Sequence, residues 1–195
     1  MITAIVGTMK SAKTNRLVDL TGIIKELHKK YVIYYPACCE KKENYVISRK
    51  DNKQAKAIKI FSVKDMYNHV DEVDYILIDE AQFICTSAEL DDFMSFLEYC
   101  DTKNKIVYLY MLNVDYISNS FDITQRVLPY CDDIDVMHAN CEICGKLADR
   151  CIRYVDNVLD NDPNSSLILM EGCNTQYKSI CKECYRKITG LNAIK

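Results

Sequence analysis

The sequence has little glycine, proline or positive charge and no long apolar run, and each shortage narrows what the chain can be. Five glycines and three prolines among 195 residues are few for a domain with many tight turns. The formal net charge of -3 at pH 7 gives no long-range attraction for nucleic acid, so we expect no nucleic-acid partner. No apolar run approaches the length of a membrane span, so we expect no membrane association.

The first residues also lack a basic segment and a small-residue cleavage site, so they do not read as a signal peptide. We therefore expect a cytoplasmic protein. Its eleven cysteines need explaining, because disulfides are rare in that compartment. The cysteines outside two CxxC pairs are expected to be packed thiols, and they are Cys38, Cys39, Cys85, Cys100, Cys131, Cys151 and Cys173.

Short apolar runs and helical patterns alternate along most of the chain. β-Branched apolar runs predict strands at residues 2–6, 31–36, 57–63, 73–79, 105–112 and 133–139. Apolar residues spaced by three and four predict a helix at 15–29, and further helices are expected at 64–70, 87–100 and 122–130. This alternation predicts an α/β fold, with a parallel sheet covered by helices on both faces.

Three details of this pattern are specific enough to be tested. The helix at 15–29 is expected to bury one apolar face, formed by Leu17, Leu20, Ile23, Ile24 and Leu27. The helix at 87–100 is expected to begin after Ser87 as its N-cap, with acidic residues in its first turn. The charged segment 40–56 is most simply an exposed loop.

The stretch "GTMKSAKT" between the first strand and the first helix has the form of a phosphate-binding loop, except that Ala12 replaces a glycine. In such a loop the backbone N–H groups surround phosphate oxygens, a lysine adds positive charge, and a hydroxyl reaches magnesium. The candidate nucleotide-binding residues are Gly7, Thr8, Met9, Lys10, Ser11, Ala12, Lys13 and Thr14. If position 12 is left-handed, alanine costs roughly 1–3 kcal/mol there. Taken alone, the stretch leaves coincidence open.

A second motif, which is acidic, favours a nucleotide-binding site over coincidence. The strand in "YILIDEAQF" ends at Asp79, which is the form of a carboxylate that supports magnesium beside a phosphate loop. Glu80 follows and is the candidate base for a hydroxyl nucleophile. Two solvated acids at a strand end are the simpler explanation of this motif by itself. Both motifs follow strands, and ligands of open α/β sheets bind at that edge, so together they predict a P-loop nucleotide site.

The two CxxC pairs, "CEIC" and "CKEC", predict a structural zinc site. Four thiolates surround zinc tetrahedrally, and a site closed by four cysteines leaves no open position for catalysis. The expected ligands are Cys141, Cys144, Cys181 and Cys184. Free thiols and a redox role for one pair are the alternatives. We expect a core over residues 1–139 and a small zinc-binding module over 140–195.

The chain resembles the type II, zinc-containing thymidine kinases over about residues 2 to 186. The motifs "GTMKSAKT", "YILIDEAQF", "LNVDYISNSF", "CEICGKLADRCIR" and "YKSICKECY" occur in the order of that family. The resemblance implies ATP- and magnesium-dependent phosphorylation of the 5′-hydroxyl of thymidine, giving dTMP for nucleotide salvage and DNA synthesis. It also implies a homotetramer, and a loop between the zinc pairs that closes over the base as a lasso.

The same resemblance implies roles for single residues. Lys13, Thr14 and Asp79 match the ATP-phosphate and magnesium positions, with Gln82 also on the nucleotide side, and Glu80 matches the general base. The positions lining the nucleoside pocket are Met9, Phe83, Leu112, Phe121, Cys151 and Tyr177.

Several residues depart from the family pattern. They fall in the phosphate loop, at the edge of the active site and in the base pocket. They are Lys10, Ala12, Cys39, Lys41, Met111, Cys151 and Cys173. Cys173 replaces one glycine of the family's Gly-Gly pair, so only Gly172 of that pair is present. These departures keep two alternatives open. One is a catalytically impaired relative that retains the fold and zinc, and the other is a kinase for a different nucleoside.

Overall fold

The fold is described by a computed structural model, which describes residues 1–39, 44–48, 52–167 and 174–190. The chain divides into two compact units. The first unit consists of Met1–Val6, Ala12–Met111 and Asp122–Val136, and the second of Gly7–Ser11, Leu112–Phe121 and Met137–Lys195. The predicted boundary between residues 139 and 140 stays a prediction.

The first unit is built around a six-stranded sheet with the strand order β5-β2-β6-β7-β1-β8. The strands are β1 (Ile2–Gly7), β2 (Tyr31–Pro36), β5 (Ile58–Ile60), β6 (Tyr75–Ile78), β7 (Ile106–Leu112) and β8 (Asp133–Met137). Strand β2 pairs in parallel with β5 and with β6, and β6 pairs in parallel with β7. The predicted α/β fold with a parallel sheet is confirmed, and the bounds predicted for β2 agree with the structure.

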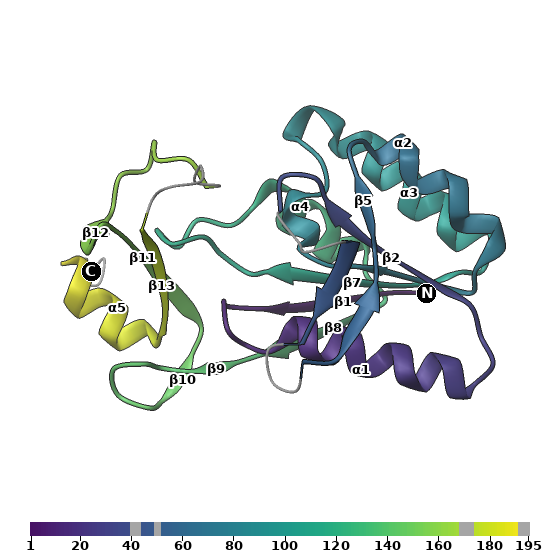
Figure 1. Cartoon of the computed structure of the whole chain (residues 1–195). Coiled ribbons are helices and arrows are strands. Elements are labelled where there is room, and N and C mark those ends of the chain that lie inside the picture. The colour runs from purple at the N-terminus through teal and green to yellow at the C-terminus, as the bar shows by residue number, and fades with distance from the viewer. Residues whose placement is uncertain (40–43, 49–51, 168–173, 191–195) are drawn as a thin grey trace. The chain divides into compact units, whose positions relative to one another are not determined.

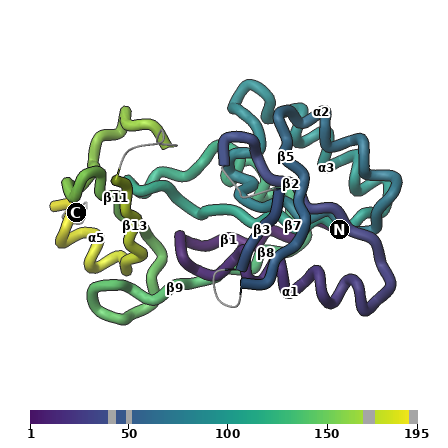
Figure 2. Tube along the Cα trace, viewed as in Figure 1, coloured from purple at the N-terminus to yellow at the C-terminus, as the bar shows by residue number. Residues whose placement is uncertain are grey.

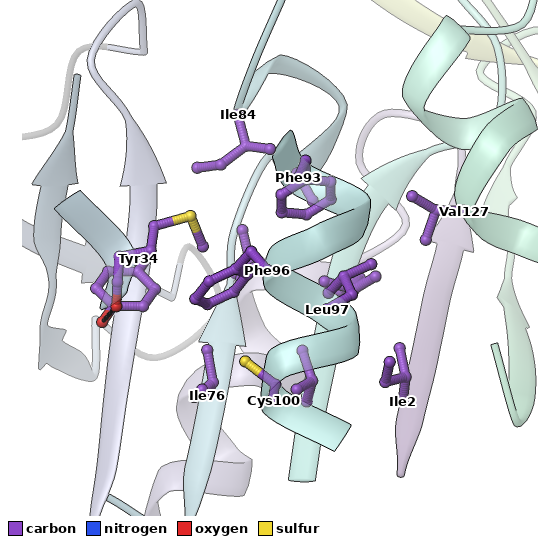
Figure 3. Close-up of a cluster of buried hydrophobic side chains, with 14 of the residues drawn as sticks. Ile2, Tyr34, Ile76, Ile84, Phe93, Phe96, Leu97, Cys100 and Val127 are labelled. Atoms are coloured by element: carbon purple, nitrogen blue, oxygen red, sulfur yellow. Dashed lines mark hydrogen bonds between the residues drawn. The ribbon is translucent and has the colours of Figure 1, made fainter. Parts of the chain in front are cut away.

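Helices cover both faces of this sheet (Figure 1). They are α1 (Lys13–Glu26), α2 (Val63–Met66), α3 (Leu90–Thr102) and α4 (Asp122–Val127), with short 3-10 turns at Tyr67–Glu72, Ala81–Phe83, Ser87–Glu89 and Leu128–Tyr130. Successive side chains of a strand point to opposite faces. Strand residues on one face, such as Ile2 and Ile76, pack with Phe96 and Leu97 of α3 in one apolar core (Figure 3).

The opposite face of the sheet lies against α1. Strand residues on this face, such as Ile5 and Leu77, are buried, as are Leu17 and Ile24 of α1. The predicted helix at 15–29 is therefore present, but α1 ends at Glu26. Its predicted apolar face was partly wrong, because Ile23 and Leu27 are 54% and 57% exposed. The sheet needs only a narrow strip of the helix, so the remaining apolar side chains stay in solvent.

The predicted N-cap Ser87 was wrong by one residue. Thr86 caps the turn Ser87–Glu89 through a capping box, in which the Thr86 N–H and hydroxyl both donate to the Glu89 carboxylate at 3.0 and 2.9 Å. Threonine followed three residues later by glutamate is the sequence form of this motif. Helix α3 then continues from Leu90.

The prediction of an exposed loop over 40–56 was also wrong for its described residues. Strands β3 (Tyr45–Ile47) and β4 (Gln54–Lys56) form an antiparallel hairpin. Val46 and Ala55 are partners in this hairpin and both are buried. One apolar residue per strand was too little to register as a strand pattern amid the charges. Residues 40–43 and 49–51 lie outside the described part of the chain.

The described residues of the second unit form small sheets, followed by helix α5 near the C-terminus (Figure 2). Strands β9 (Ala139–Asn140) and β10 (Leu147–Ala148) pair with each other, and β11 (Arg150–Val155) lies between β12 (Val158–Asp160) and β13 (Thr175–Ile180). Helix α5 (Lys182–Thr189) follows β13. Among the described residues of the whole chain, no helix has both the length and the apolar character needed to cross a membrane.

Candidate active site and metal centre

The candidate phosphate loop connects β1 to α1 and contains two residues in the left-handed conformation. Lys10 has φ 61° and Ala12, which is the N-cap of α1, has φ 64°. An L-residue with a Cβ is strained in this region, and glycine is not. Gly7 is also required, because a Cβ there would meet the Met137 carbonyl and come within 2.8 Å of Ser11 Oγ. Position 12 is therefore left-handed, and alanine there strains the loop.

Lys13, Thr14 and Asp79 lie together in the first unit. Thr14 Oγ1 is 3.5 and 3.4 Å from the two carboxylate oxygens of Asp79, while Asp79 and Lys13 are both buried. Neighbouring ligands of an octahedral magnesium ion with bonds of about 2.1 Å lie about 3 Å apart. The hydroxyl and the carboxylate therefore fit a magnesium ion that they hold directly or through one water.

Glu80 follows Asp79 at the end of β6 and is itself left-handed, with φ 53°. The Gln82 amide donates to a Glu80 carboxylate oxygen at 2.7 Å, and the Phe83 N–H donates to the Glu80 carbonyl at 2.9 Å. Gln82 is buried. A strained backbone held by its neighbours is common at functional sites. Here the hydrogen bonds from Gln82 and Phe83 fix the direction of the Glu80 carboxylate.

The second unit brings together several of the predicted nucleoside-binding residues. In the β11–β13 pair, Cys151 is opposite Ser179 and Arg153 is opposite Tyr177. Residues two apart along a strand point to the same face of a sheet, and so do residues directly opposite each other on paired strands. Cys151 and Tyr177 therefore lie on the same face. The Ser179 hydroxyl on this face donates to the Met9 carbonyl at 2.5 Å.

Leu112 and Phe121 are the ends of a loop in the same unit. Asp115 organises this loop by accepting the N–H groups of Ile117 and Asn119 at 2.9 and 2.8 Å. Burial raises the pKa of Asp115. The predicted pocket residue Phe83, in contrast, belongs to the first unit.

Sequence reasoning missed Arg153, which is fully buried. Its guanidinium donates to one Asp160 oxygen through Nε at 2.9 Å and Nη2 at 2.6 Å, and to the Ser166 carbonyl at 2.6 Å. The centroid of the Tyr116 ring lies 3.7 Å from the guanidinium carbon of Arg153. The side chain of Tyr177 is a further hydrogen-bond partner of Arg153. The period-two pattern of "RCIRYV" was the available signal, because it places Arg153 on the face of Cys151.

The four predicted zinc ligands come together in the second unit. The sulfurs of Cys141, Cys144, Cys181 and Cys184 all lie within 4.8 Å of one another, and Cys144 Sγ is 3.6 Å from Cys181 Sγ. Sulfurs around zinc, with bonds of about 2.3 Å, stand about 3.8 Å apart in a tetrahedron. The donor set and the close approach of the four sulfurs therefore fit a zinc ion.

Local structure explains how each pair of cysteines is presented. Cys141 and Cys144 lie on the turn between β9 and β10, where the Gly145 N–H donates to the Cys141 carbonyl at 2.9 Å and Gly145 has φ 76°. Cys181 is the N-cap of α5 and Cys184 lies in its first turn. This is the arrangement of a closed structural site.

The pKa values of two of these thiols are shifted in opposite directions. Burial acts to raise the pKa of Cys141, but hydrogen bonds from the backbone N–H groups of Cys181, Cys144 and Ile143 outweigh it and lower that pKa to about 6. Burial and hydrogen bonds to the other thiols raise the pKa of Cys184 to about 12. Zinc binds thiolate, so binding must release protons from this cluster.

The zinc cluster is connected to the phosphate loop within the second unit. Lys10 Nζ forms an ion pair with Glu142 Oε1 at 2.8 Å, and that oxygen also accepts the Ser179 N–H at 2.7 Å. Lys10 is one of the departures noted in the sequence, and Glu142 lies between two zinc ligands. The Lys10 side chain therefore has an ionic partner in this structure.

Comparison with known proteins shows the family to which the chain belongs. A family model described as thymidine kinase matches residues 1–185 of the chain. The chain belongs to the thymidine kinase family. Membership makes it a nucleoside kinase, which is a transferase, and the combination of a phosphate loop with a four-cysteine cluster fits the zinc-containing type II branch of the family.

Individual members of the thymidine kinase family are similar over most of the chain. The thymidine kinase of Mycoplasma genitalium is 30% identical over 180 residues, which cover 91% of this chain and 79% of that protein. That of Bacteroides thetaiotaomicron is 27% identical over 197 residues, covering 100% and 91%. The match to the Mesoplasma florum thymidine kinase, 33% identical over 115 residues, covers 59% of this chain and about half, 53%, of that protein.

The departures from the thymidine kinase pattern fall in different surroundings. Met111 is buried in the core of the first unit, and Cys151 is buried on the face that also holds Tyr177. Cys39 follows the end of β2. The remaining departures, Lys41 and Cys173 with its neighbour Gly172, lie outside the described residues.

Proposed function

We propose that this chain transfers the γ-phosphoryl group of ATP to the 5′-hydroxyl of thymidine, giving dTMP. The observation that supports it most is the arrangement at the end of β6. There Asp79 faces Thr14 across 3.4 Å, and the next residue, Glu80, is fixed by Gln82. A magnesium-binding pair followed directly by an oriented carboxylate suits phosphoryl transfer to a hydroxyl group.

Each residue has a defined part in this reaction. Glu80 takes the proton from the 5′-hydroxyl as its oxygen forms a bond to the γ-phosphorus and the bond to the β–γ bridging oxygen breaks. Lys13 places its positive charge against the phosphate oxygens, and the loop N–H groups hold them. Thr14 and Asp79 would hold a magnesium ion, which would supply further positive charge against the phosphates. Catalysis is then mainly positioning and electrostatics.

We propose that the second unit recognises the nucleoside. Cys151 and Tyr177 share a face of the β11–β13 pair. Leu112 and Phe121 are the two ends of a loop, and Tyr116 within this loop packs on Arg153. The roles of Met9 and Phe83 in the pocket rest on the family resemblance. The same resemblance is the basis for proposing a homotetramer, which sedimentation velocity would test.

A panel of nucleosides incubated with ATP and magnesium tests the function, with ADP formation as the measurement. We expect turnover with thymidine, and with deoxyuridine as the nearest analogue. A preference for any other nucleoside would show a kinase of different specificity. No turnover with any nucleoside would show the impaired relative, which the strained Ala12 makes a specific alternative.

The variant Glu80→Gln tests the mechanism. It keeps the hydrogen bond geometry with Gln82 but removes the base, so kcat should fall by about 10²–10⁴-fold while ATP still binds. Glu26→Gln, at the exposed end of α1, is the matched control and should leave kcat unchanged. An unchanged kcat in Glu80→Gln would remove Glu80 from the role of base.

A further inference from the structure

Two neighbouring cysteines, Cys38 and Cys39, follow β2 at the same sheet edge as Glu80. Strands β2 and β6 are parallel neighbours, with Tyr34 opposite Ile78, so their following residues leave the sheet at one edge. The Asp79 N–H donates to the Tyr34 carbonyl at 2.9 Å. The cysteine pair therefore lies on the active-site side of the first unit.

The pair is held in a defined turn. The Cys39 N–H donates to the Pro36 carbonyl at 3.0 Å, and the Cys38 thiol lies 3.9 Å from the Phe83 carbonyl, to which it donates a weak hydrogen bond. Phe83 in turn donates its N–H to the Glu80 carbonyl. One contact thus joins the thiol to the short turn that fixes Glu80.

Cys38 differs from the other described cysteines outside the zinc cluster. It is the exposed member of that set. A hydrogen bond from the Cys39 thiol lowers the pKa of Cys38 to about 7, although partial burial and the Glu80 carboxylate act to raise it. Burial instead raises the pKa values of Cys85 and Cys100 to about 12 and that of Cys131 to about 11.

We propose that Cys38 and Cys39 form an oxidative modification site, in which a peroxide oxidises Cys38 and Cys39 then closes a disulfide with it. An accessible thiolate beside a second thiol is the usual arrangement of such a site. Its effect on activity rests on the proposed kinase function, because the contact that changes leads to Glu80.

The chemistry balances in two steps. The Cys38 thiolate attacks one oxygen of hydrogen peroxide, an S–O bond forms, the O–O bond breaks, and hydroxide leaves, so that Cys38 becomes a sulfenic acid. The Cys39 sulfur then attacks the Cys38 sulfur and the S–O bond breaks. The thiol proton leaves with the hydroxyl as water. Two thiols are oxidised by two electrons, and one peroxide is reduced.

Oxidation joins the Cys38 sulfur to Cys39 and so ends its 3.9 Å contact with the Phe83 carbonyl. The turn from Glu80 to Phe83 then loses a contact from its side facing β2. We expect kcat to fall by about fivefold or more, which is the effect of one lost hydrogen bond. Dithiothreitol should restore the activity by reducing the disulfide.

The experiment treats the zinc-loaded full chain with hydrogen peroxide at about one equivalent, and follows kinase activity and peptide masses together. Trypsin releases residues 31–41, which contain both cysteines. We expect this peptide to lose two hydrogens under non-reducing conditions. Zinc content is measured on the same samples, so that oxidation of the zinc ligands is seen directly.

Three variants make the result specific. Cys38→Ser should resist peroxide while keeping its untreated activity within about twofold. Cys39→Ser should stop at the sulfenic acid, which dimedone labels on Cys38. Cys131→Ser is the matched control with a half-buried thiol and should respond to peroxide as the unsubstituted chain does.

Two results would overturn the proposal. One is oxidation of Cys85, Cys131 or the zinc ligands in preference to residues 31–41. The other is a Cys38–Cys39 disulfide that leaves kcat unchanged. If the chain phosphorylates no nucleoside, the proposed function fails, whereas the peptide masses and dimedone labelling still decide whether the modification site exists.

Discussion

Arg153 and Asp160 form a buried ion pair in the second unit, with two guanidinium N–H groups donating to one carboxylate oxygen at 2.9 and 2.6 Å. The Arg153 side chain is fully buried and that of Asp160 is 10% exposed. The same guanidinium holds the Ser166 carbonyl and packs on Tyr116, whose hydroxyl donates to the Asp162 carbonyl at 2.6 Å. One arginine thus joins β11, the segment 160–166 and the loop that ends at Phe121.

Replacing this arginine tests its importance. Arg153→Met leaves the Asp160 carboxylate buried without its partner, and breaking such a pair destabilises by about 3–5 kcal/mol. We expect that loss in urea unfolding, together with a raised KM for the nucleoside, because Tyr177 also loses a partner. Lys187→Met, which removes an exposed ion pair with Glu183 on α5, is the control and should change neither quantity. Equal stability of the two variants would contradict the structural role of Arg153.

The same ion pair makes stability depend on pH. Burial acts to raise the pKa of Asp160, but the hydrogen bonds from Arg153 outweigh it and the pKa is lowered. A lowered carboxylate pKa stabilises the fold above the unfolded value of about 3.9, and this contribution is lost as pH falls through the folded value. The difference in unfolding free energy between the unsubstituted chain and Asp160→Asn should therefore be constant from about pH 7 to 5 and shrink below about pH 4. A difference that grows on acidification would contradict the assigned pairing.

Much of the first unit follows from the sequence because each signal there is local. The apolar run of β2 lies between polar residues and Pro36, and its bounds were predicted as observed. The hairpin β3–β4 was missed because its burial rests on Val46 and Ala55, one residue in each strand. Their burial comes from tertiary packing, which no short window of sequence contains.

The candidate site divides in the same way. The spacing of the CxxC pairs was enough to predict four sulfurs that do converge, because each pair needs only a tight turn. Arg153 could not be predicted as buried, since arginine is mostly exposed unless it is paired. Its partners Asp160 and Tyr116 are brought to it by the β11–β12 turn and by a separate loop.

Relieving the strain at Ala12 should improve the phosphate loop. Ala12 has φ 64°, and glycine occupies this region without the penalty of roughly 1–2 kcal/mol that a Cβ brings. If the loop holds this conformation only with ATP bound, Ala12→Gly should tighten ATP binding by up to about thirtyfold. If the loop holds it without ATP as well, the substitution should instead raise the melting temperature. His28→Gly, at the other end of α1 with φ 54°, should raise stability without affecting ATP affinity. Calorimetric titration with ATP and thermal unfolding distinguish the two positions. No gain from Ala12→Gly in either measurement would show that the loop is unstrained.

Zinc should be part of the folded second unit. Each chain should contain about one zinc ion, and chelation should remove it together with the order of the β9–β10 turn and of α5, because the binding free energy of a structural zinc is also folding free energy. The ligands bind as thiolates, and burial with hydrogen bonding raises the pKa of Cys184 to about 12, so zinc binding releases protons and its affinity should rise with pH. Elemental analysis, competition with a chromogenic chelator from pH 6 to 8, and circular dichroism measure these effects. Cys184→Ser should lose the metal, whereas Cys131→Ser should keep it. Freshly purified protein without zinc, or an affinity that falls as pH rises, would contradict a thiolate zinc site.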